Sequence, residues 1–173
     1  MVFAVMQFIF GPTIGSLSDR FGRRPVLLVS LVIIAMDFIV MGLALSIWLL
    51  VITRIIGGIA AATQATAAAF ISNISTPENR SANFGILGAT FGVGFVLGPL
   101  MGRLLGEVGL RVPFFAAAAL ATLNLILGYL VLPETVTDQT RRPFDIKRAN
   151  PLGALTQIRL IPGLSRFLLV FFL

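Results

Sequence analysis

The feature that most constrains this chain is a succession of long apolar stretches, nearly free of charge, with short polar segments between them. Three stretches carry no charged residue: Met1 to Ser18, Ser81 to Gly102 and Val112 to Pro133. A fourth, residues 25–74, carries only Asp37 and Arg54 and is long enough for two spans. Because about 20 helical residues cross a hydrocarbon core of roughly 30 Å, the pattern predicts an all-α, multi-pass membrane protein with five crossings.

The composition agrees with a membrane protein and excludes several classes of function. Of the 173 residues, 57% are hydrophobic and 12% are charged, and the mean hydropathy is +1.00, whereas about a quarter of a soluble protein is charged. The sequence has no Cys and no His, which excludes thiol and imidazole chemistry and the usual zinc sites. It also lacks a P-loop and a G-x-S-x-G motif, so we expect neither an enzyme nor a cofactor or metal.

The most polar connecting segment is Gly15 to Pro25, with the sequence GSLSDRFGRRP. We expect a tight loop between two spans, because charges this dense do not lie in hydrocarbon and because Gly and Pro favour a turn. Connecting segments that are separated by two spans lie on the same side of the membrane. This places ten of the 13 cations on the side of this loop and only Arg103 and Arg111 on the other, with Arg54 inside a span. The positive-inside rule then makes the loop cytoplasmic, so the net charge of +6 reflects orientation rather than nucleic-acid binding.

The other connections within residues 1–133 are predicted from polarity and proline. We expect a turn near Ser46 to Trp48, with Trp48 at the membrane interface. A polar loop is expected at Ser75 to Asn83, where Pro77 would stop the preceding helix, and a short loop at Arg103 to Arg111.

The sequence after Pro133 changes character. Residues 134–163 are polar and basic and are interpreted as a cytoplasmic central loop, and residues 164–173 as the start of another span. Asn150 and Pro151 would begin a short helix on the membrane surface, although a loose linker fits this segment equally well. Since both ends of the sequence lie in apolar stretches, we expect a piece of a longer protein.

An internal similarity points to a class of membrane protein. The stretch from Gly11, GPTIGSLSDRFGRRP, aligns without gaps to the stretch from Gly98, GPLMGRLLGEVGLRV, at an offset of 87 residues. Three predicted crossings separate the two copies, so they face opposite sides of the membrane. Inverted repeats of this kind are typical of secondary transporters.

These motifs resemble those of the major facilitator superfamily. The loop between its second and third helices is similar to the run Gly15, Leu17, Ser18, Asp19, Arg20, Phe21, Gly22, Arg23, Arg24 and Pro25. Its antiporter motif in helix five resembles Gly94, Gly98, Pro99 and Gly102, although Arg103 stands where a further glycine is common. Arg54, followed by Gly57 and Gly58, resembles the arginine motif of helix four.

The resemblance is strongest to the tetracycline/proton antiporter branch, and it implies an architecture. Residues 1–133 would correspond to helices two to six of the N-terminal half, in a protein with twelve helices in two halves. The loop with Gly15, Asp19, Arg20, Gly22, Arg23 and Arg24 would hold the two halves together on the cytoplasmic side, with its contact partner in the missing half. It further implies a multi-pass protein of the inner (plasma) membrane.

Asp37 is the residue whose position most suggests chemistry. It lies 13 residues after Arg24, about 20 Å along a helix, where a carboxylate costs roughly 2.5 to 3.5 kcal/mol on the insertion scale. Such surroundings disfavour the charged form, which suits a group that gains and loses a proton. Arg54 lies at a similar depth, so the alternative is a structural ion pair, and the two roles are compatible. The resemblance implies that an acid here handles substrate and protons.

Two further sets of residues are candidates for packing or cavity lining. The glycine run is predicted to allow close helix packing: Gly85, Gly88, Gly92, Gly94, Gly98 and Gly102. Gln7, Gln64 and Asn124 are uncharged polar groups in spans, which would form interhelical hydrogen bonds or line a substrate cavity.

The sequence therefore predicts a secondary active transporter that exports a tetracycline-like or other amphipathic drug in exchange for protons. The expected partners are this small molecule, protons, membrane lipid and the second half of the same protein. The alternatives are a proton-coupled exporter of a different small molecule and a truncated membrane fragment without transport.

Overall fold

The computed structural model describes residues 1–136, which form helices and connecting segments without a strand among them. The helices of this part of the chain are α1 (Val2–Phe21), α2 (Arg23–Leu43), α3 (Ile47–Ala61), α4 (Gln64–Ile74), α5 (Arg80–Val108) and α6 (Val112–Val131). Five segments are long and apolar enough to cross a membrane, with α3 and α4 together forming the span Ile47–Ile74. The five predicted crossings are confirmed, whereas the surface helix at Asn150 and the span at 164–173 lie outside the described residues.

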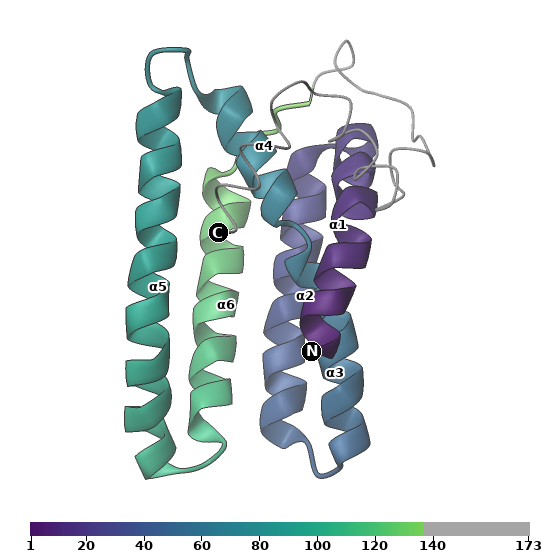
Figure 1. Ribbon diagram of the computed structural model, residues 1–173. Helices are drawn as coiled ribbons and strands as arrows, with labels where there is room; N and C mark the ends of the chain where they lie inside the picture. Colours follow the sequence, from purple (N-terminus) through teal and green to yellow (C-terminus); the bar gives the residue numbers. More distant parts are fainter. Residues whose placement is uncertain (137–173) are drawn as a thin grey trace, which may run out of the picture.

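The connections fall at two ends of the bundle (Figure 1). The α1–α2 and α4–α5 connections and residues 132–136, which follow α6, lie at one end, and the α2–α3 and α5–α6 connections lie at the other. This is the grouping from which the cytoplasmic side was predicted. The turn near Ser46 is also observed, because α2 ends at Leu43 and α3 begins at Ile47, where the Ser46 side chain accepts a hydrogen bond from the Trp48 amide at 3.3 Å.

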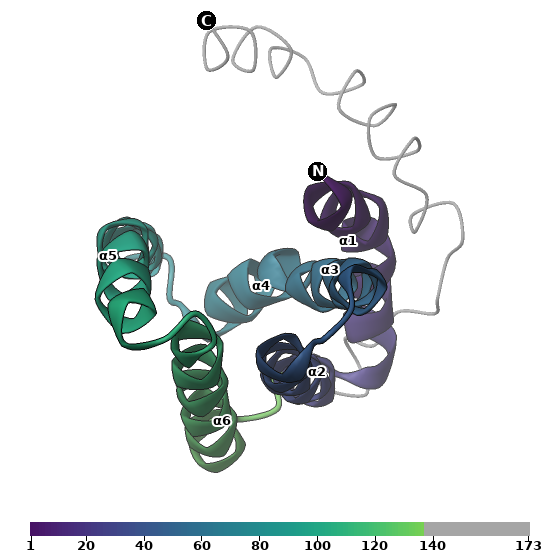
Figure 2. The same ribbon diagram turned by 90° about the horizontal axis from the view of Figure 1, so that it is seen from below.

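Helix α2 lies between α6 and α3, with α1 and α4 alongside (Figure 2). The residues buried here are mainly small, and among them are Ala35, Ala60, Ala62 and Ala118. Small side chains let the helix backbones approach closely, which is how helices associate in a bilayer. Large apolar side chains are mostly exposed on the outside of the bundle, as expected for surfaces that meet lipid rather than water.

Two predicted loops are much shorter than expected. Helix α1 continues to Phe21 and α2 begins at Arg23, so only Gly22 separates them. Helix α5 likewise continues through Arg103 to Val108, which leaves residues 109–111 as the connection. Backbone hydrogen bonds within a helix do not require apolar side chains, so a helix can continue through charged residues where the membrane ends. Pro25 is the third residue of α2, within the first turn, where its missing N–H breaks no helical hydrogen bond.

The predicted close packing of the α5 glycines is wrong within residues 1–136. A Cβ added at any of Gly85, Gly88, Gly92, Gly94, Gly98 or Gly102 would meet nothing within 4 Å. No residue of α5 is buried, and the helix contacts only α6 and the short α4 substantially (Figure 2). Periodic small residues show that a helix face permits close approach, but they do not identify which helix approaches it.

Candidate functional site

Asp37 and Arg54 meet across the interface of α2 and α3. Asp37 Oδ2 lies 3.9 Å from Arg54 Nη2, and the side chain of Asp37 is 6% exposed while that of Arg54 is 40% exposed. The predicted pairing is therefore present as a loose ion pair between one buried and one half-exposed group. The hairpin at residues 44–46 produces it, because Asp37 lies before and Arg54 after this turn, at a similar distance from it.

The rest of the Arg54 side chain is held by contacts from two helices. Its Nη2 atom also contacts the sulfur of Met41, and its guanidinium carbon lies 5.7 Å from the ring centroid of Phe3. A cation over an aromatic face is attracted by the ring quadrupole. Arg54 is thereby fixed between α1 and α2 and directed toward Asp37.

One carboxylate oxygen of Asp37 has no partner within the described part of the chain. Asp37 Oδ1 is buried and forms no hydrogen bond, while Oδ2 faces Arg54 and the backbone of Gly57. A Cβ on Gly57 would lie 2.7 Å from Oδ2, so a glycine is needed here for the carboxylate to fit. A buried oxygen without a donor is costly and can be satisfied by binding a proton or a donor from a ligand.

Asp37 also lines a cavity of about 340 Å³ between α2 and α3. The other lining residues are apolar apart from Thr53, whose hydroxyl donates to the Leu50 carbonyl at 2.9 Å. The cavity thus offers one carboxyl group in an otherwise apolar lining. Such a site suits a ligand that is largely apolar with few polar groups.

The α1–α2 connection forms a second polar centre, at the cytoplasmic end predicted from charge. Gly22 has φ +105° and is the only residue with positive φ among the described ones. The carboxylate of Glu134, which follows α6, accepts a hydrogen bond from the Arg23 amide at 3.1 Å and from the amides of Thr135 and Val136 at 2.9 and 3.0 Å. Glu134 therefore caps the N-terminus of α2 from a distance of 111 residues in sequence.

The three arginines of this connection have different partners. Arg23 Nη2 lies 3.3 Å from Asp19 Oδ1, which ties the end of α1 to the start of α2. Arg24 Nη2 donates to the Tyr129 carbonyl at 2.8 Å, and its guanidinium lies over the Tyr129 ring. Arg20 is exposed and lies over the ring of Phe21, without an ion pair inside residues 1–136. Gly15 lies within α1, and a Cβ there would meet nothing within 4 Å.

The uncharged polar candidates do not gather at one place. Gln7 donates to the Ala61 carbonyl at 3.3 Å, an interhelical hydrogen bond between α1 and α3. Gln64 and Asn124 line a cavity of about 320 Å³ among α2, α4 and α6, together with Thr63. Gln7 is not among the residues that line this cavity. The antiporter residues Gly94, Gly98, Pro99 and Gly102 lie on α5, apart from both charged centres.

Some residues of these centres were missed from sequence. Glu134 and Tyr129 contact the arginines of the α1–α2 connection. Separately, Thr66 Oγ1 donates a hydrogen bond to Ser18 Oγ at 3.3 Å, which joins α4 to α1, and both residues are 1% exposed. Glu134 had a signal, because the positive-inside rule explains cations on the cytoplasmic side and does not explain an acid there. Ser18 and Thr66 had none, since their pairing depends on the arrangement of α1 and α4.

The sequence matches the Major Facilitator Superfamily over residues 1–173. The chain belongs to this superfamily. Its five apolar helices and its family make the chain a multi-pass protein of the inner (plasma) membrane. The all-α membrane fold predicted from its motifs is confirmed.

Relatives within the superfamily include antibiotic resistance proteins. The chain is 42% identical over 172 residues to a tetracycline resistance protein of class C from Escherichia coli, covering 99% of the chain and 43% of that protein. It is 44% identical over 134 residues to the class H protein of Pasteurella multocida, covering 78% and 34%. Multidrug resistance protein 1 of Bacillus subtilis is 38% identical over 133 residues, covering 76% and 34%. The resemblance to the tetracycline branch is confirmed, and the chain spans less than half the length of these relatives.

A solved structure supports the arrangement of the helices. The human organic anion transporter MFSD10 (TETRAN) superposes on this chain with a TM-score of 0.75 at 32% sequence identity. The superposition covers 82% of this chain and 32% of that protein. The fold is therefore shared with a transporter that is named for organic anions rather than for tetracyclines.

Proposed function

We propose that this chain forms part of a transporter that exports a tetracycline-like drug, or another amphipathic compound, in exchange for protons. The observation that carries the proposal is Asp37, a buried carboxyl with one oxygen at 3.9 Å from Arg54 and the other without a partner. The names of the relatives, which are tetracycline and multidrug resistance proteins, support drug export.

The proposed chemistry at Asp37 is exchange of a proton against the Arg54 ion pair. When the carboxyl is ionised, Arg54 neutralises it, and when it binds a proton, Arg54 is released toward its exposed side. Protonation thereby changes the force that holds α2 against α3. A conformational change of the bundle needs such a difference between two states, since a ligand without differential interaction shifts no equilibrium.

The cytoplasmic connection is proposed to control access from that side. Asp19 and Arg23 form one pair, and because the Asp19 side chain is 41% exposed, it can also meet a group from another part of the protein. The proposed partner of this connection is a second half of the transporter, as the resemblance of this loop to that of the major facilitator superfamily implies. The antiporter residues of α5 are proposed to act at a surface that the described residues leave open.

A transport assay on the full-length transporter tests this function. Cells that carry the unmodified protein should accumulate less tetracycline than cells with an empty vector, and a protonophore should abolish the difference. Asp37→Asn should abolish exclusion at unchanged membrane expression. The matched control is Glu107→Gln, which removes an exposed carboxylate that pairs with Arg103 on its own helix. Full exclusion by Asp37→Asn would contradict the role of Asp37, and no exclusion by the unmodified protein would favour a membrane protein without transport.

A second substrate class has its own support. The 38% identity to a Bacillus multidrug resistance protein and the shared fold with an organic anion transporter favour an exporter of a different small molecule. Ethidium accumulation, measured in the same cells with and without protonophore, separates the two. Exclusion of ethidium but not tetracycline would replace the tetracycline assignment.

A further inference from the structure

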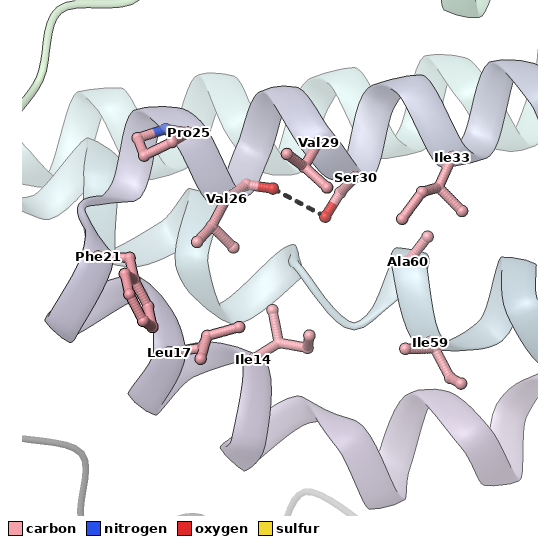
Figure 3. Close-up of a pocket in the computed structure, with 10 residues that line it drawn as sticks. All are labelled: Ile14, Leu17, Phe21, Pro25, Val26, Val29, Ser30, Ile33, Ile59 and Ala60. Atoms are coloured by element: carbon pink, nitrogen blue, oxygen red, sulfur yellow. Dashed lines mark hydrogen bonds between the residues drawn. The ribbon is translucent and has the colours of Figure 1, made fainter.

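An apolar groove opens on the surface of the bundle between the cytoplasmic halves of α1 and α2 (Figure 3). Its volume is about 260 Å³, and Ile59 and Ala60 of α3 close its back. Phe21 is 56% exposed and Val29 is 58% exposed, so the groove is open between these two side chains. It is separate from the cavity at Asp37, apart from Ile33, which touches both.

The lining of this groove leaves no polar group for a ligand to satisfy. Ser30 is the single lining residue with a polar side chain, and its hydroxyl donates to the Val26 carbonyl at 2.9 Å (Figure 3). An occupant of the groove is therefore hydrocarbon. From Pro25 to Ile33 the groove follows α2 over nine residues, a rise of about 12 Å, which is most of the depth of one leaflet's hydrocarbon.

A cation lies at the cytoplasmic mouth of the groove. The guanidinium carbon of Arg20 is 5.1 Å from the ring centroid of Phe21, which is itself a wall of the groove. Arg23 is paired with Asp19, and Arg24 donates to Tyr129, but Arg20 is exposed and has no acidic partner within the described residues. Among the described residues, the mouth thus presents one positive charge without an acidic partner, just after the uncharged stretch that ends at Ser18.

We propose that this groove binds one anionic phospholipid of the cytoplasmic leaflet. An acyl chain occupies the apolar groove between Phe21 and Ile33, and the phosphate lies on Arg20. The assignment follows from charge complementarity together with the apolar lining: a zwitterionic lipid would fill the groove but gain less from Arg20, and a free phosphate would use Arg20 but leave the groove empty. Anionic lipids of the cytoplasmic leaflet are attracted to juxtamembrane arginines in general.

Lipid binding to the purified chain in mild detergent, followed by native mass spectrometry, tests this site. The chain should retain phosphatidylglycerol in preference to phosphatidylcholine. Arg20→Gln should weaken phosphatidylglycerol binding about fivefold, as expected for one exposed cation, and should weaken phosphatidylcholine binding less. Val29→Trp, which places a large ring in the groove, should weaken binding of both lipids. Glycerol 3-phosphate, which has the phosphate without acyl chains, should not displace the bound lipid.

Matched controls separate the groove from general effects. Arg103→Gln removes an exposed arginine at the other end of the bundle, and Ile39→Trp enlarges an exposed side chain of α2 outside the groove. Equal loss of phosphatidylglycerol in Arg20→Gln and Arg103→Gln, equal effects of Val29→Trp and Ile39→Trp, or displacement by glycerol 3-phosphate would each overturn the proposal. Circular dichroism of every variant establishes that it is folded, and because binding needs no transport, a negative result leaves the export proposal intact.

Discussion

The backbone of Gly22 lies directly against the carboxylate of Glu134. A Cβ on Gly22 would be 2.5 Å from Glu134 Oε2, and the residue has φ +105°, a conformation that side chains other than glycine rarely adopt. The same carboxylate accepts the Arg23 amide. Gly22 is therefore needed for two independent reasons, the local turn between α1 and α2 and the approach of a residue that follows α6.

Gly22→Ala should destabilise the bundle by about 1 to 3 kcal/mol, because it adds both backbone strain and a clash. The thermal unfolding midpoint of the purified chain measures this. Gly15→Ala is the matched control, since Gly15 lies inside α1 with nothing within 4 Å of its added Cβ. It should be neutral or slightly stabilising, as expected for alanine in a helix interior. Equal destabilisation by the two changes would contradict the special role of Gly22.

Glu134→Ala should expose the start of α2, because it removes the side chain that accepts the Arg23 amide. Loss of a helix cap costs about 1 kcal/mol. Hydrogen exchange at the Arg23 amide should become faster, while exchange in the middle of α2 should not change. Glu134→Gln keeps an acceptor oxygen of the same reach and should restore most of the protection. If Glu134→Gln behaves like Glu134→Ala, the negative charge rather than the hydrogen bond is what matters.

The parts of this fold that sequence could predict are those that depend on local composition. The five crossings follow from apolar length, and the meeting of Asp37 with Arg54 follows from equal distances to one tight turn. Which connections lie at the same end of the bundle follows from the number of spans between them, since an even number returns the chain to the same side. Each of these needs only the period of a helix and the thickness of a bilayer.

The parts that sequence could not predict depend on which helices become neighbours. Glu134 reaches the Arg23 amide because α6 packs along α2, and no local pattern reveals a contact between residues 111 positions apart. The spacing of the α5 glycines led to a prediction of close packing that is not found among the described residues, because such spacing permits packing but does not identify the helix that packs there. The length of the α1–α2 loop was overestimated because charge marks where the membrane ends and does not mark where a helix ends.

Arg54→Gln should destabilise the chain more than Asp37→Asn does. The first change leaves the buried carboxyl of Asp37 without its cation, whereas the second leaves Arg54, which is 40% exposed, in contact with Phe3 and Met41. Breaking one side of a buried pair costs up to about 3 to 5 kcal/mol, and less here because Arg54 is partly exposed. The double variant should recover part of the loss. Unfolding measurements on the four proteins give the coupling, and strictly additive effects would argue against an energetic pair.

Glu78, in the α4–α5 connection, should titrate at lower pH than an ordinary glutamate. Its own backbone N–H and the Thr76 hydroxyl donate to the carboxylate, which lowers the pKa of Glu78. A lowered pKa in the folded state means that any contribution to stability is present above the unfolded pKa and is lost as pH falls through the folded pKa. NMR titration of the chain should show this, and Thr76→Val should move the pKa part of the way back. An unchanged pKa in Thr76→Val would mean that the backbone bond alone is responsible.

Gly58 and Gly92 provide a matched pair that tests whether α5 is unpacked. A Cβ on Gly58 would lie 2.6 Å from the Phe3 carbonyl oxygen and 2.9 Å from Met6 Cβ, so α1 would have to move away from α3. Gly58→Ala should cost about 1 to 3 kcal/mol, the usual range for overpacking. A Cβ on Gly92 would meet nothing within 4 Å, so Gly92→Ala should gain about 0.5 to 1 kcal/mol from helix propensity.

The comparison is made on the purified chain by thermal unfolding. Destabilisation by Gly92→Ala similar to that by Gly58→Ala would show that another helix, from a second copy or from residues beyond 136, covers the glycine face of α5. The opposite signs expected here follow from one difference, because the backbone of a neighbouring helix lies against Gly58 and none of the described residues lies against Gly92.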